Sequence, residues 1–449
     1  MLTKRFFLLQ FIYIFVIAFL FFGCSSKNIE PKMQIKIEQK MPIYDLVHLP
    51  QNPEAYTKDI NFTASALDMQ EEFKHFYFKV WNIEKHSTLL EEIQWPFQSY
   101  TVSNSYGENL QPHTQSFFDT MYENSNFDTF STLNKRAITL CRVDMRLFPT
   151  NTPLLYDPSL AGEGFPFDYL QNSAVHANKP VFVSHYSKDK EWVYIFSSFA
   201  SGWVKAKEIA FLEKTYTDLW QNAEQIFLTQ DNIALYDEEG DFLFKSKIGM
   251  MLPLVEEDEA SYTLLSVSSY KTSEPLFVKT KISKAFAHKE KLDFTSENLN
   301  KIVGQLSLSH YGWGGMYDQR DCSSMLRDLF APFGIWLPRN SYSQSKVGQV
   351  IGFEGMSDEE KTKIIKEKGI PFKTLLYRKG HIVLYVGTVE NEIVIFHDTW
   401  GIRTLNNGIE GRIIIGKAIF SSLYLGKEQK NYDKNRGMLQ SLKSMNILF

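Results

Sequence analysis

Residues 310–334 read His-Tyr-Gly-Trp-Gly-Gly-Met-Tyr-Asp-Gln-Arg-Asp-Cys-Ser-Ser-Met-Leu-Arg-Asp-Leu-Phe-Ala-Pro-Phe-Gly. The first half of this stretch is a loop rich in glycine and aromatic residues, and the second half has helical periodicity that stops at Gly334. Cys322 falls in the first turn of the helix, where unpaired N–H groups and the positive end of the helix dipole favour a thiolate. A thiolate in this position is typical of a cysteine hydrolase, and a half-buried structural cysteine is the alternative.

Two histidines further along the chain are predicted to meet at the open end of a β-hairpin. Residues 380–387 and 392–401 are rich in β-branched and aromatic residues and read as strands, with a turn at 388–391. If the turn centres near Glu390, the numbers of paired residues sum to about 779, which sets His381 opposite His397 or Asp398. One histidine can then act as base to Cys322 while the other orients its ring, although either histidine alone is also explained as an ordinary edge residue.

Five short motifs follow one another in a fixed order. They are Tyr311-Gly-Trp-Gly-Gly315, Asp321-Cys-Ser323, Leu337-Pro-Arg-Asn-Ser-Tyr-Ser-Gln344, Gly380-His-Ile-Val-Leu-Tyr-Val-Gly387 and His397-Asp-Thr-Trp-Gly401. In order and spacing they resemble the NlpC family, papain-like cysteine peptidases of bacterial cell walls, across residues 295–425. Ser324 stands where the family usually has glycine, a change that a helix tolerates.

The resemblance implies a papain-like α+β peptidase domain, which we assign to residues 293–425. It implies a Cys-His-His triad with Cys322 as nucleophile, His381 as base and His397 as orienting residue. It also implies that five residues line the substrate groove. These are Tyr311, Trp313, Asp321, Ser323 and Ser341.

The expected reaction is hydrolysis of the γ-D-glutamyl–diamino acid bond in peptidoglycan stem peptides or muropeptides, with no cofactor. Two other functions are alternatives to this one. Cys322, His381 and His397 are a plausible set of zinc ligands, but the sequence offers no fourth ligand and no general-base glutamate. The second alternative is a catalytically silent lipoprotein that binds the cell wall through two SH3-like barrels. Such a binder has no need of Cys322, His381 and His397 together.

The N-terminus is predicted to be a lipoprotein signal peptide that ends at residue 24. Lys4 and Arg5 precede an apolar stretch over residues 6–22, and Gly23-Cys24 then resembles a bacterial lipobox. Lipidation of Cys24 would anchor the mature protein to a membrane of the cell envelope, with its globular part in the periplasm. The alternative is an uncleaved membrane anchor, because seventeen residues can just span a bilayer.

The rest of the chain predicts a multidomain α+β fold. Residues 25–135 read as a polar, proline-broken tether to about residue 60 and then a helical domain, in which Pro96 is expected to end a helix. Residues 136–215, with a strand expected at 137–143, are similar to bacterial SH3 barrels, and residues 216–292 read as a second, diverged SH3-like barrel. Residues 426–449 read as a mobile tail. The predicted order is an N-terminal helical segment, two small SH3-like β-barrels and the papain-like peptidase domain.

The charge and the cysteine content limit which classes of partner and of thiol chemistry the sequence supports. The chain has 48 basic and 52 acidic residues, a net charge of −4, so nothing in it indicates a nucleic-acid partner. Its three cysteines, Cys24, Cys141 and Cys322, cannot form a disulfide framework. Cys141 is expected to be a buried strand residue, which leaves Cys322 as the candidate reactive thiol.

Overall fold

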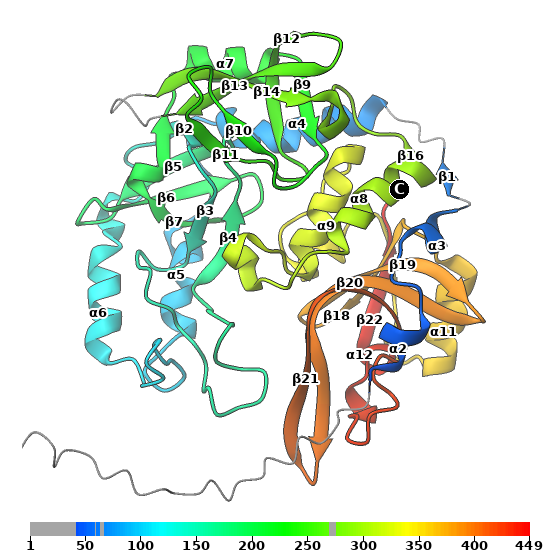
Figure 1. Ribbon diagram of the computed structural model, residues 1–449. Coiled ribbons are helices and arrows are strands. Elements are labelled where there is room, and N and C mark those ends of the chain that lie inside the picture. The colour runs from blue at the N-terminus through cyan, green and yellow to red at the C-terminus, as the bar shows by residue number, and fades with distance from the viewer. Residues whose placement is uncertain (1–41, 59, 63–66, 269–274) are drawn as a thin grey trace, which may run out of the picture. The chain divides into compact units, whose positions relative to one another are not determined.

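The predicted α+β fold class is confirmed by the computed structural model, which describes residues 42–449 except residues 59, 63–66 and 269–274 (Figure 1). Residues Ile43–Phe449 form a single unit by their internal contacts. The signal peptide, Cys24 and the first part of the tether lie outside the described residues and stay predictions. Within the described ranges, no helix combines the length and the apolar character needed to cross a membrane.

The later part of the predicted tether is not a free linker, because it is docked on the peptidase domain from residue 43 onward. Its elements are α2 (Tyr44–His48), α3 (Glu54–Thr57) and β1 (Asn61–Phe62). The buried Asp45 carboxylate accepts hydrogen bonds from the backbone N–H (2.8 Å) and the hydroxyl (2.9 Å) of Ser422. Strand β1 pairs with β16 (Phe294–Thr295) at the start of the predicted peptidase domain. The polar, proline-rich composition of this segment gives no indication of these long-range contacts.

The helical part contains α4 (Leu67–Phe78), α5 (Leu90–Ser99) and α6 (Gln115–Asn124). The prediction that Pro96 ends a helix is wrong, since α5 continues through it to Ser99. Proline removes only its own N–H from the helical hydrogen bonds, and the Pro96 carbonyl still accepts a 2.9 Å bond from the N–H of Tyr100.

The first barrel is a seven-stranded antiparallel sheet in the order β4-β3-β7-β6-β5-β2-β8. Its strands are β2 (Lys135–Thr139), β3 (Val143–Arg146), β4 (Gln171–Val175), β5 (Pro180–Tyr186), β6 (Trp192–Ser197), β7 (Ser201–Lys205) and β8 (Ile209–Phe211). The strand expected at 137–143 is divided, because the chain bends between β2 and β3. Cys141 lies half-buried in that bend instead of inside a strand.

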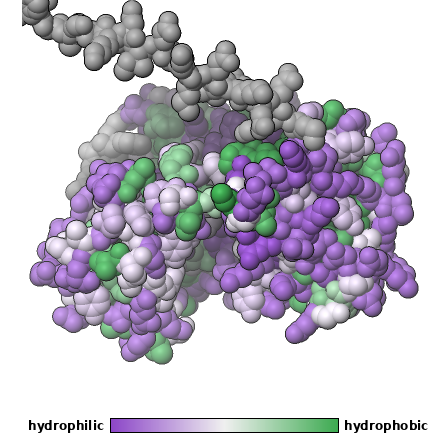
Figure 2. Space-filling view, turned by 90° about the horizontal axis from the view of Figure 1, so that it is seen from below, coloured by the Kyte–Doolittle hydropathy of each residue, from purple (hydrophilic) through white to green (hydrophobic). Residues whose placement is uncertain are grey.

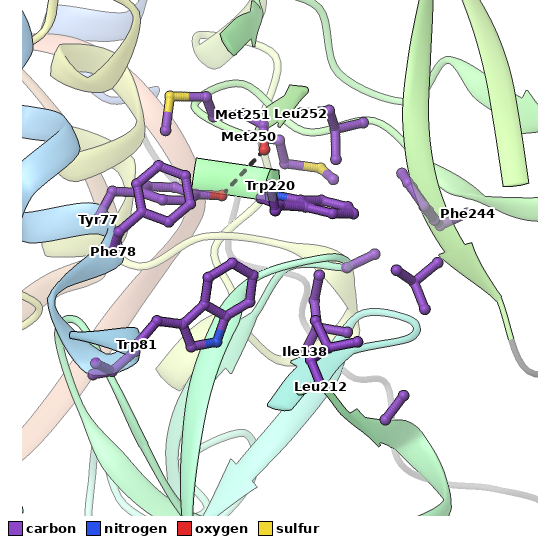
Figure 3. Close-up of a cluster of buried hydrophobic side chains, with 14 of the residues drawn as sticks. Tyr77, Phe78, Trp81, Ile138, Leu212, Trp220, Phe244, Met250, Met251 and Leu252 are labelled. Carbon is purple, nitrogen blue, oxygen red and sulfur yellow. Dashed lines mark hydrogen bonds between the residues drawn. The ribbon is translucent and has the colours of Figure 1, made fainter. Parts of the chain in front are cut away.

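The second barrel follows α7 (Lys214–Asn222) and has a five-stranded sheet in the order β14-β13-β12-β9-β15, with a separate β10-β11 hairpin. Its strands are β9 (Gln225–Leu228), β10 (Ala234–Tyr236), β11 (Phe242–Lys245), β12 (Met251–Glu257), β13 (Ser261–Ser268), β14 (Leu276–Ser283) and β15 (Ala287–His288). Tyr77 and Trp81 from the helical part share one apolar cluster with both barrels (Figure 3). The helices therefore cover the barrels and pack into the barrels' core.

The predicted peptidase domain is built on a six-stranded antiparallel sheet in the order β17-β22-β18-β19-β20-β21. Its strands are β17 (Gln349–Gly352), β18 (Thr374–Arg378), β19 (His381–Val389), β20 (Glu392–Asn406), β21 (Ile409–Ser422) and β22 (Leu442–Ile447). The helices are α8 (Ser296–Leu306), α9 (Cys322–Phe330), α10 (Ser341–Gln344), α11 (Asp358–Lys368) and α12 (Met438–Ser441). Alternate residues of β19 face two different cores, one with α8 and α9 and the other with α11 and α12.

The prediction that residues 426–449 form a mobile tail is wrong. Strand β22 lies inside the sheet, between β17 and β18, and Met445 and Asn446 are fully buried. The Asn446 side chain donates to the carbonyl oxygens of Gln344 (3.0 Å) and Val347 (2.7 Å). The short strand β22 contains several polar residues and shows no alternation of apolar and polar residues in the sequence. It is buried because strands pair with it on both sides.

Candidate active site

Helix α9 presents Cys322 as its first residue, as the sequence predicts. The Asp321 carboxylate caps the helix by accepting from the N–H of Ser324 (2.9 Å), and the Ser324 hydroxyl accepts in return from the N–H of Asp321 (2.9 Å). The serine that departs from the family pattern therefore completes the cap.

Cys322 as a residue is only 7% exposed, and the backbone N–H of Ile382 donates a hydrogen bond to its thiol. Burial and, after it, the Asp321 carboxylate raise the pKa of Cys322 to about 12. The resting thiol is therefore neutral, which differs from the thiolate that the helix end alone favours. No hydrogen bond joins this thiol to His381 within the described part of the chain, an arrangement common in enzymes without bound substrate.

The two predicted histidines meet at the open end of the β19–β20 hairpin. His381 Nε2 lies 2.9 Å from His397 Nδ1, and His397 Nε2 lies 3.0 Å from the Ser421 hydroxyl on β21. The pairing register differs slightly from the expected one, since Leu384 pairs with Phe396 and a bulge follows Tyr385. The two rings meet because their side chains reach across the sheet although their backbones are not directly paired.

The hydrogen bonds around the histidines fix a direction for the protons. Ser421 donates its hydroxyl proton to the carbonyl of Ser422 (3.1 Å), so its oxygen accepts from His397 Nε2–H. His397 Nδ1 is then an acceptor for His381 Nε2–H, which leaves His381 Nδ1 without a proton. Burial, together with Arg378, lowers the pKa of His381 to about 3 and keeps the ring neutral.

The residue after His397 is not part of this chain of bonds. Asp398 is fully buried, and neither of its carboxyl oxygens has a hydrogen-bond partner among the described residues. Burial, and then the charge of Asp321, raise the pKa of Asp398 well above its usual value. Of the two residues predicted to face His381, His397 is thus the one that contacts it.

Asp321 and Ser323 are held from below by Arg339, a residue that the sequence motifs contain but do not single out. Arg339 donates to both Asp321 oxygens (3.1 and 2.6 Å), to Ser323 Oγ (3.0 Å) and to Ser173 Oγ of the first barrel (2.8 Å). All these groups are buried. Although burial opposes it, the Arg339 charge lowers the pKa of Asp321. The Asp321 carboxylate is thus engaged by the protein itself, and its contact with substrate stays a prediction.

The loop with Tyr311 and Trp313 lies against the first barrel. Trp313 Nε1 donates to the carbonyl of Asp168 (2.9 Å), and the Tyr311 ring lies 5.9 Å from that of Trp400. A Cβ on Gly314, at φ 59°, would lie 2.6 Å from Gln171, so only glycine allows this close approach. The glycine-rich loop is therefore shaped to fit strand β4.

Ser341 begins α10 and is half-buried, and its hydroxyl makes no hydrogen bond to the residues that the structure describes. A cavity of about 260 Å³ opens at the histidines, lined by both His381 and His397 and by Tyr311 and Trp400. Three His, Cys, Asp or Glu side chains placed to hold a metal ion are not found in the ranges that the structure describes.

Sequence comparison identifies four segments by family. Residues 13–130 match the N-terminal stabilising domain of NlpC/P60 proteins, residues 153–205 an SH3 domain of the SH3b1 type, residues 217–259 an SH3 domain of the SH3b2 type, and residues 309–408 the NlpC/P60 family. No protein with a curated description matches the chain.

Two solved structures are similar to this one. An NlpC/P60 endopeptidase from Photobacterium damselae subsp. piscicida is 25% identical, with a TM-score of 0.78 over 89% of this chain and 97% of that chain. An NlpC/P60 family protein from Bacillus cereus is 15% identical, with a TM-score of 0.44 over 70% of this chain and 99% of that chain. The first similarity spans the helical part, both barrels and the C-terminal domain together.

Proposed function

Since residues 309–408 belong to the NlpC/P60 family and follow its stabilising and SH3b domains, we propose that this protein cleaves the γ-D-glutamyl–diamino acid bond of peptidoglycan stem peptides. The domain content is that of a cell-wall cysteine peptidase, a hydrolase. The specific bond is our inference, and it rests on the family resemblance together with the site geometry. The stem peptide, free or within muropeptides, is the proposed partner.

The observation that carries the proposal is the hydrogen-bonded series from Ser421 through His397 to His381. It supports a neutral His381 whose Nδ1 is free to take a proton. In the proposed reaction the Cys322 thiol gives its proton to His381 Nδ1 while sulfur attacks the carbonyl carbon of the substrate. Because thiol and imidazole both begin neutral, proton transfer accompanies the attack and does not precede it.

The remaining steps return the proton and release both products. The backbone N–H of Cys322 has no acceptor among the described residues and could donate to the oxyanion at the helix start. Protonated His381 then gives its proton to the leaving amine as the carbon–nitrogen bond breaks, and a thioester to Cys322 remains. Water, deprotonated by His381, hydrolyses the thioester and regenerates the thiol.

The test is mass spectrometry of defined peptidoglycan fragments before and after incubation with the protein lacking residues 1–24. New products that end in γ-D-glutamate and begin with a free diamino acid are expected. Cleavage at any other bond, or none, would overturn the proposed specificity.

The nucleophile is tested in the same assay. Cys322→Ala should lower turnover by about 10⁴-fold or more with an unchanged melting temperature, whereas Cys141→Ala should keep full activity. Retained wall binding by an inactive Cys322→Ala variant would separate the enzyme from a silent binder. Undiminished hydrolysis by Cys322→Ala would remove the assignment altogether.

We also propose that Cys24 is lipidated and anchors the protein to an envelope membrane, on the basis of the Gly23-Cys24 motif. Stable attachment requires more than one acyl chain, so mass spectrometry of the mature N-terminus should find multiple acylation. Cys24→Ser should accumulate as an unprocessed precursor. Normal cleavage of that variant would contradict lipidation.

A further inference from the structure

A second, smaller cavity lies where helix α9 meets the first barrel and helix α4. Its polar lining consists of His176 and Lys179, from the connection between β4 and β5, and of Arg327 and Asp328 from α9. Its volume is about 30 Å³, which is enough for one or two particles of the size of a water molecule. None of the three proposed triad residues lines it, so the cavity is separate from the site described above.

The Lys179 side chain brings a positive charge into this cavity without a counter-ion. Lys179 is only 6% exposed, and its ammonium has neither a hydrogen bond nor an ion pair to any residue that the structure describes. Its Nζ lies 3.0 Å from the centre of the Tyr77 ring, whose hydroxyl bonds instead to the Met251 carbonyl at 3.5 Å (Figure 3). An aromatic face attracts a cation but carries no net charge, so the ammonium stays uncompensated.

Donor groups on the opposite wall are also without partners. Arg327 Nη1 and both ring nitrogens of His176 are buried, with no hydrogen-bond partner among the described residues. His176 Nε2 lies 3.6 Å from the Asp328 carboxylate, which is too long for a hydrogen bond. The other nitrogens of Arg327 bind Asp328 at 3.3 and 3.1 Å. Unused donors from the first barrel and from α9 therefore border the same small space.

The charges around the cavity do not balance. The Asp328 carboxylate also accepts from Arg320 Nε at 2.8 Å, and Arg320 is paired in turn with Asp231. Three cationic side chains, Arg320, Arg327 and Lys179, thus stand against two carboxylates, and one positive charge is left over. Burying an unpaired charge is costly, so a ligand that supplies one negative charge would stabilise this junction.

We propose that the cavity binds a monatomic halide anion, chloride under ordinary conditions, between the Lys179 ammonium and the Arg327 guanidinium. Burial, and after it the charge of Arg327, lower the pKa of Lys179 well below its usual value, although Asp328 opposes them. A bound anion would offset that shift because it favours the charged ammonium. Hydrophilic residues predominate on the outer face that Figure 2 shows, where water can solvate the charges, and Lys179 lacks this access. The ion would tie the first barrel to α9 and is independent of the proposed reaction.

The test measures melting temperature in sodium chloride and in sodium gluconate, with the protein lacking residues 1–24. Equal ionic strength keeps screening the same, and gluconate is too large for the cavity. Chloride should raise the melting temperature by about 2–4 °C relative to gluconate, because it binds the folded state alone. Lys179→Met removes the charge but keeps an unbranched chain, so this variant should fold and lose the chloride effect. Lys207→Met is the matched control, since Lys207 is exposed on the same barrel, and it should keep the effect.

Crystals grown in sodium bromide locate the ion directly. An anomalous bromide peak between Lys179 and Arg327, together with the loss of the chloride effect in Lys179→Met, would support the site. Ordered water there without a bromide signal would overturn it. So would a chloride effect of the same size in Lys179→Met, or a bromide peak with no chloride effect in solution, which would mean binding at crystal concentration only.

Discussion

The two sides of the active site are held by different kinds of interaction. On the cysteine side, Arg339 pairs with Asp321 beneath the nucleophile, and Arg320 pairs with Asp328 on α9 and with Asp231 of the second barrel, all largely buried. On the histidine side, the contacts join neutral groups within the strands β19, β20 and β21. Charges therefore hold the proposed nucleophile in place, and neutral hydrogen bonds hold the proposed base.

Because of this difference, substitutions on the two sides should affect different properties, stability on the cysteine side and turnover on the histidine side. The charged network reaches Ser173 in the first barrel and Asp231 in the second. A substitution on the cysteine side therefore alters contacts in three domains. The histidine series stays inside one sheet, and a change there should affect turnover with little effect on folding. The following predictions test that separation, beginning with the largest expected effect.

Within the histidine series the two rings should not be equivalent. His381→Ala should lower kcat by about 10⁴-fold or more because it removes the base, whereas His397→Asn should lower kcat by about 10- to 100-fold because asparagine can still accept a hydrogen bond. Steady-state kinetics and melting curves of both variants provide the measurement, with little change expected in melting temperature. Equal loss in both would mean that the roles are shared, and a fully active His397→Asn would favour Asp398 as third member.

The pH dependence of alkylation should report a neutral resting pair. With the pKa of Cys322 at about 12 and that of His381 at about 3, the thiolate fraction should rise about tenfold per pH unit between pH 6 and 9. Iodoacetamide labelling of the Cys141→Ala protein, followed by mass spectrometry, measures the rate at Cys322. A rate independent of pH from 5 to 8 would indicate a thiolate–imidazolium pair and contradict the neutral arrangement.

On the cysteine side, removal of one charge should lower stability. Arg339→Leu leaves the buried Asp321 carboxylate unpaired, so the free energy of unfolding should fall by about 3–5 kcal/mol. Urea titration of this variant gives the measurement, and the Arg339→Leu/Asp321→Asn double variant should recover part of the loss. A single variant that unfolds at the same urea concentration as the unmodified protein would show that the charges are not what holds this side.

The smallest expected effect belongs to the last hydroxyl of the histidine series. Ser421→Ala removes the acceptor for His397 Nε2–H, and kcat should fall about three- to tenfold while stability changes by about 1 kcal/mol. Ser421→Thr retains a hydroxyl at the same position and should recover much of the activity. If Ser421→Ala lowers stability strongly and leaves kcat unchanged, the serine supports the sheet and does not orient His397.

The sequence predicted where Cys322 and the two histidines lie, because their signals are local. Cys322 at a helix start and two histidines on a hairpin follow from periodicity and turn chemistry within a few residues. Arg339, Arg378 and Ser421 were not predicted, since each acquires its role from a partner that the fold brings close. Arg339 contacts Ser173, which is remote in sequence, and Arg378 lowers the pKa of His381 because β18 pairs with β19.

Errors in the fold prediction have the same origin. Residues 43–62 and 426–449 looked unstructured because each is polar or irregular when taken alone. Their order comes from distant strands and helices, as between Asp45 and Ser422 or between β22 and β17. Composition reports what a segment can bury by itself and cannot report a surface supplied by another part of the chain.

The position of β22 also bears on how the protein folds during synthesis. This strand leaves the ribosome after both of its neighbours in the sheet, and it joins β17 to β18 by pairing Gln349 with Ile447 and Leu376 with Met445. Until then both neighbours present an open edge, which is prone to pair with other chains. Translocation across a membrane before folding, or a chaperone that shields these edges, would protect the nascent sheet until its inner strand arrives.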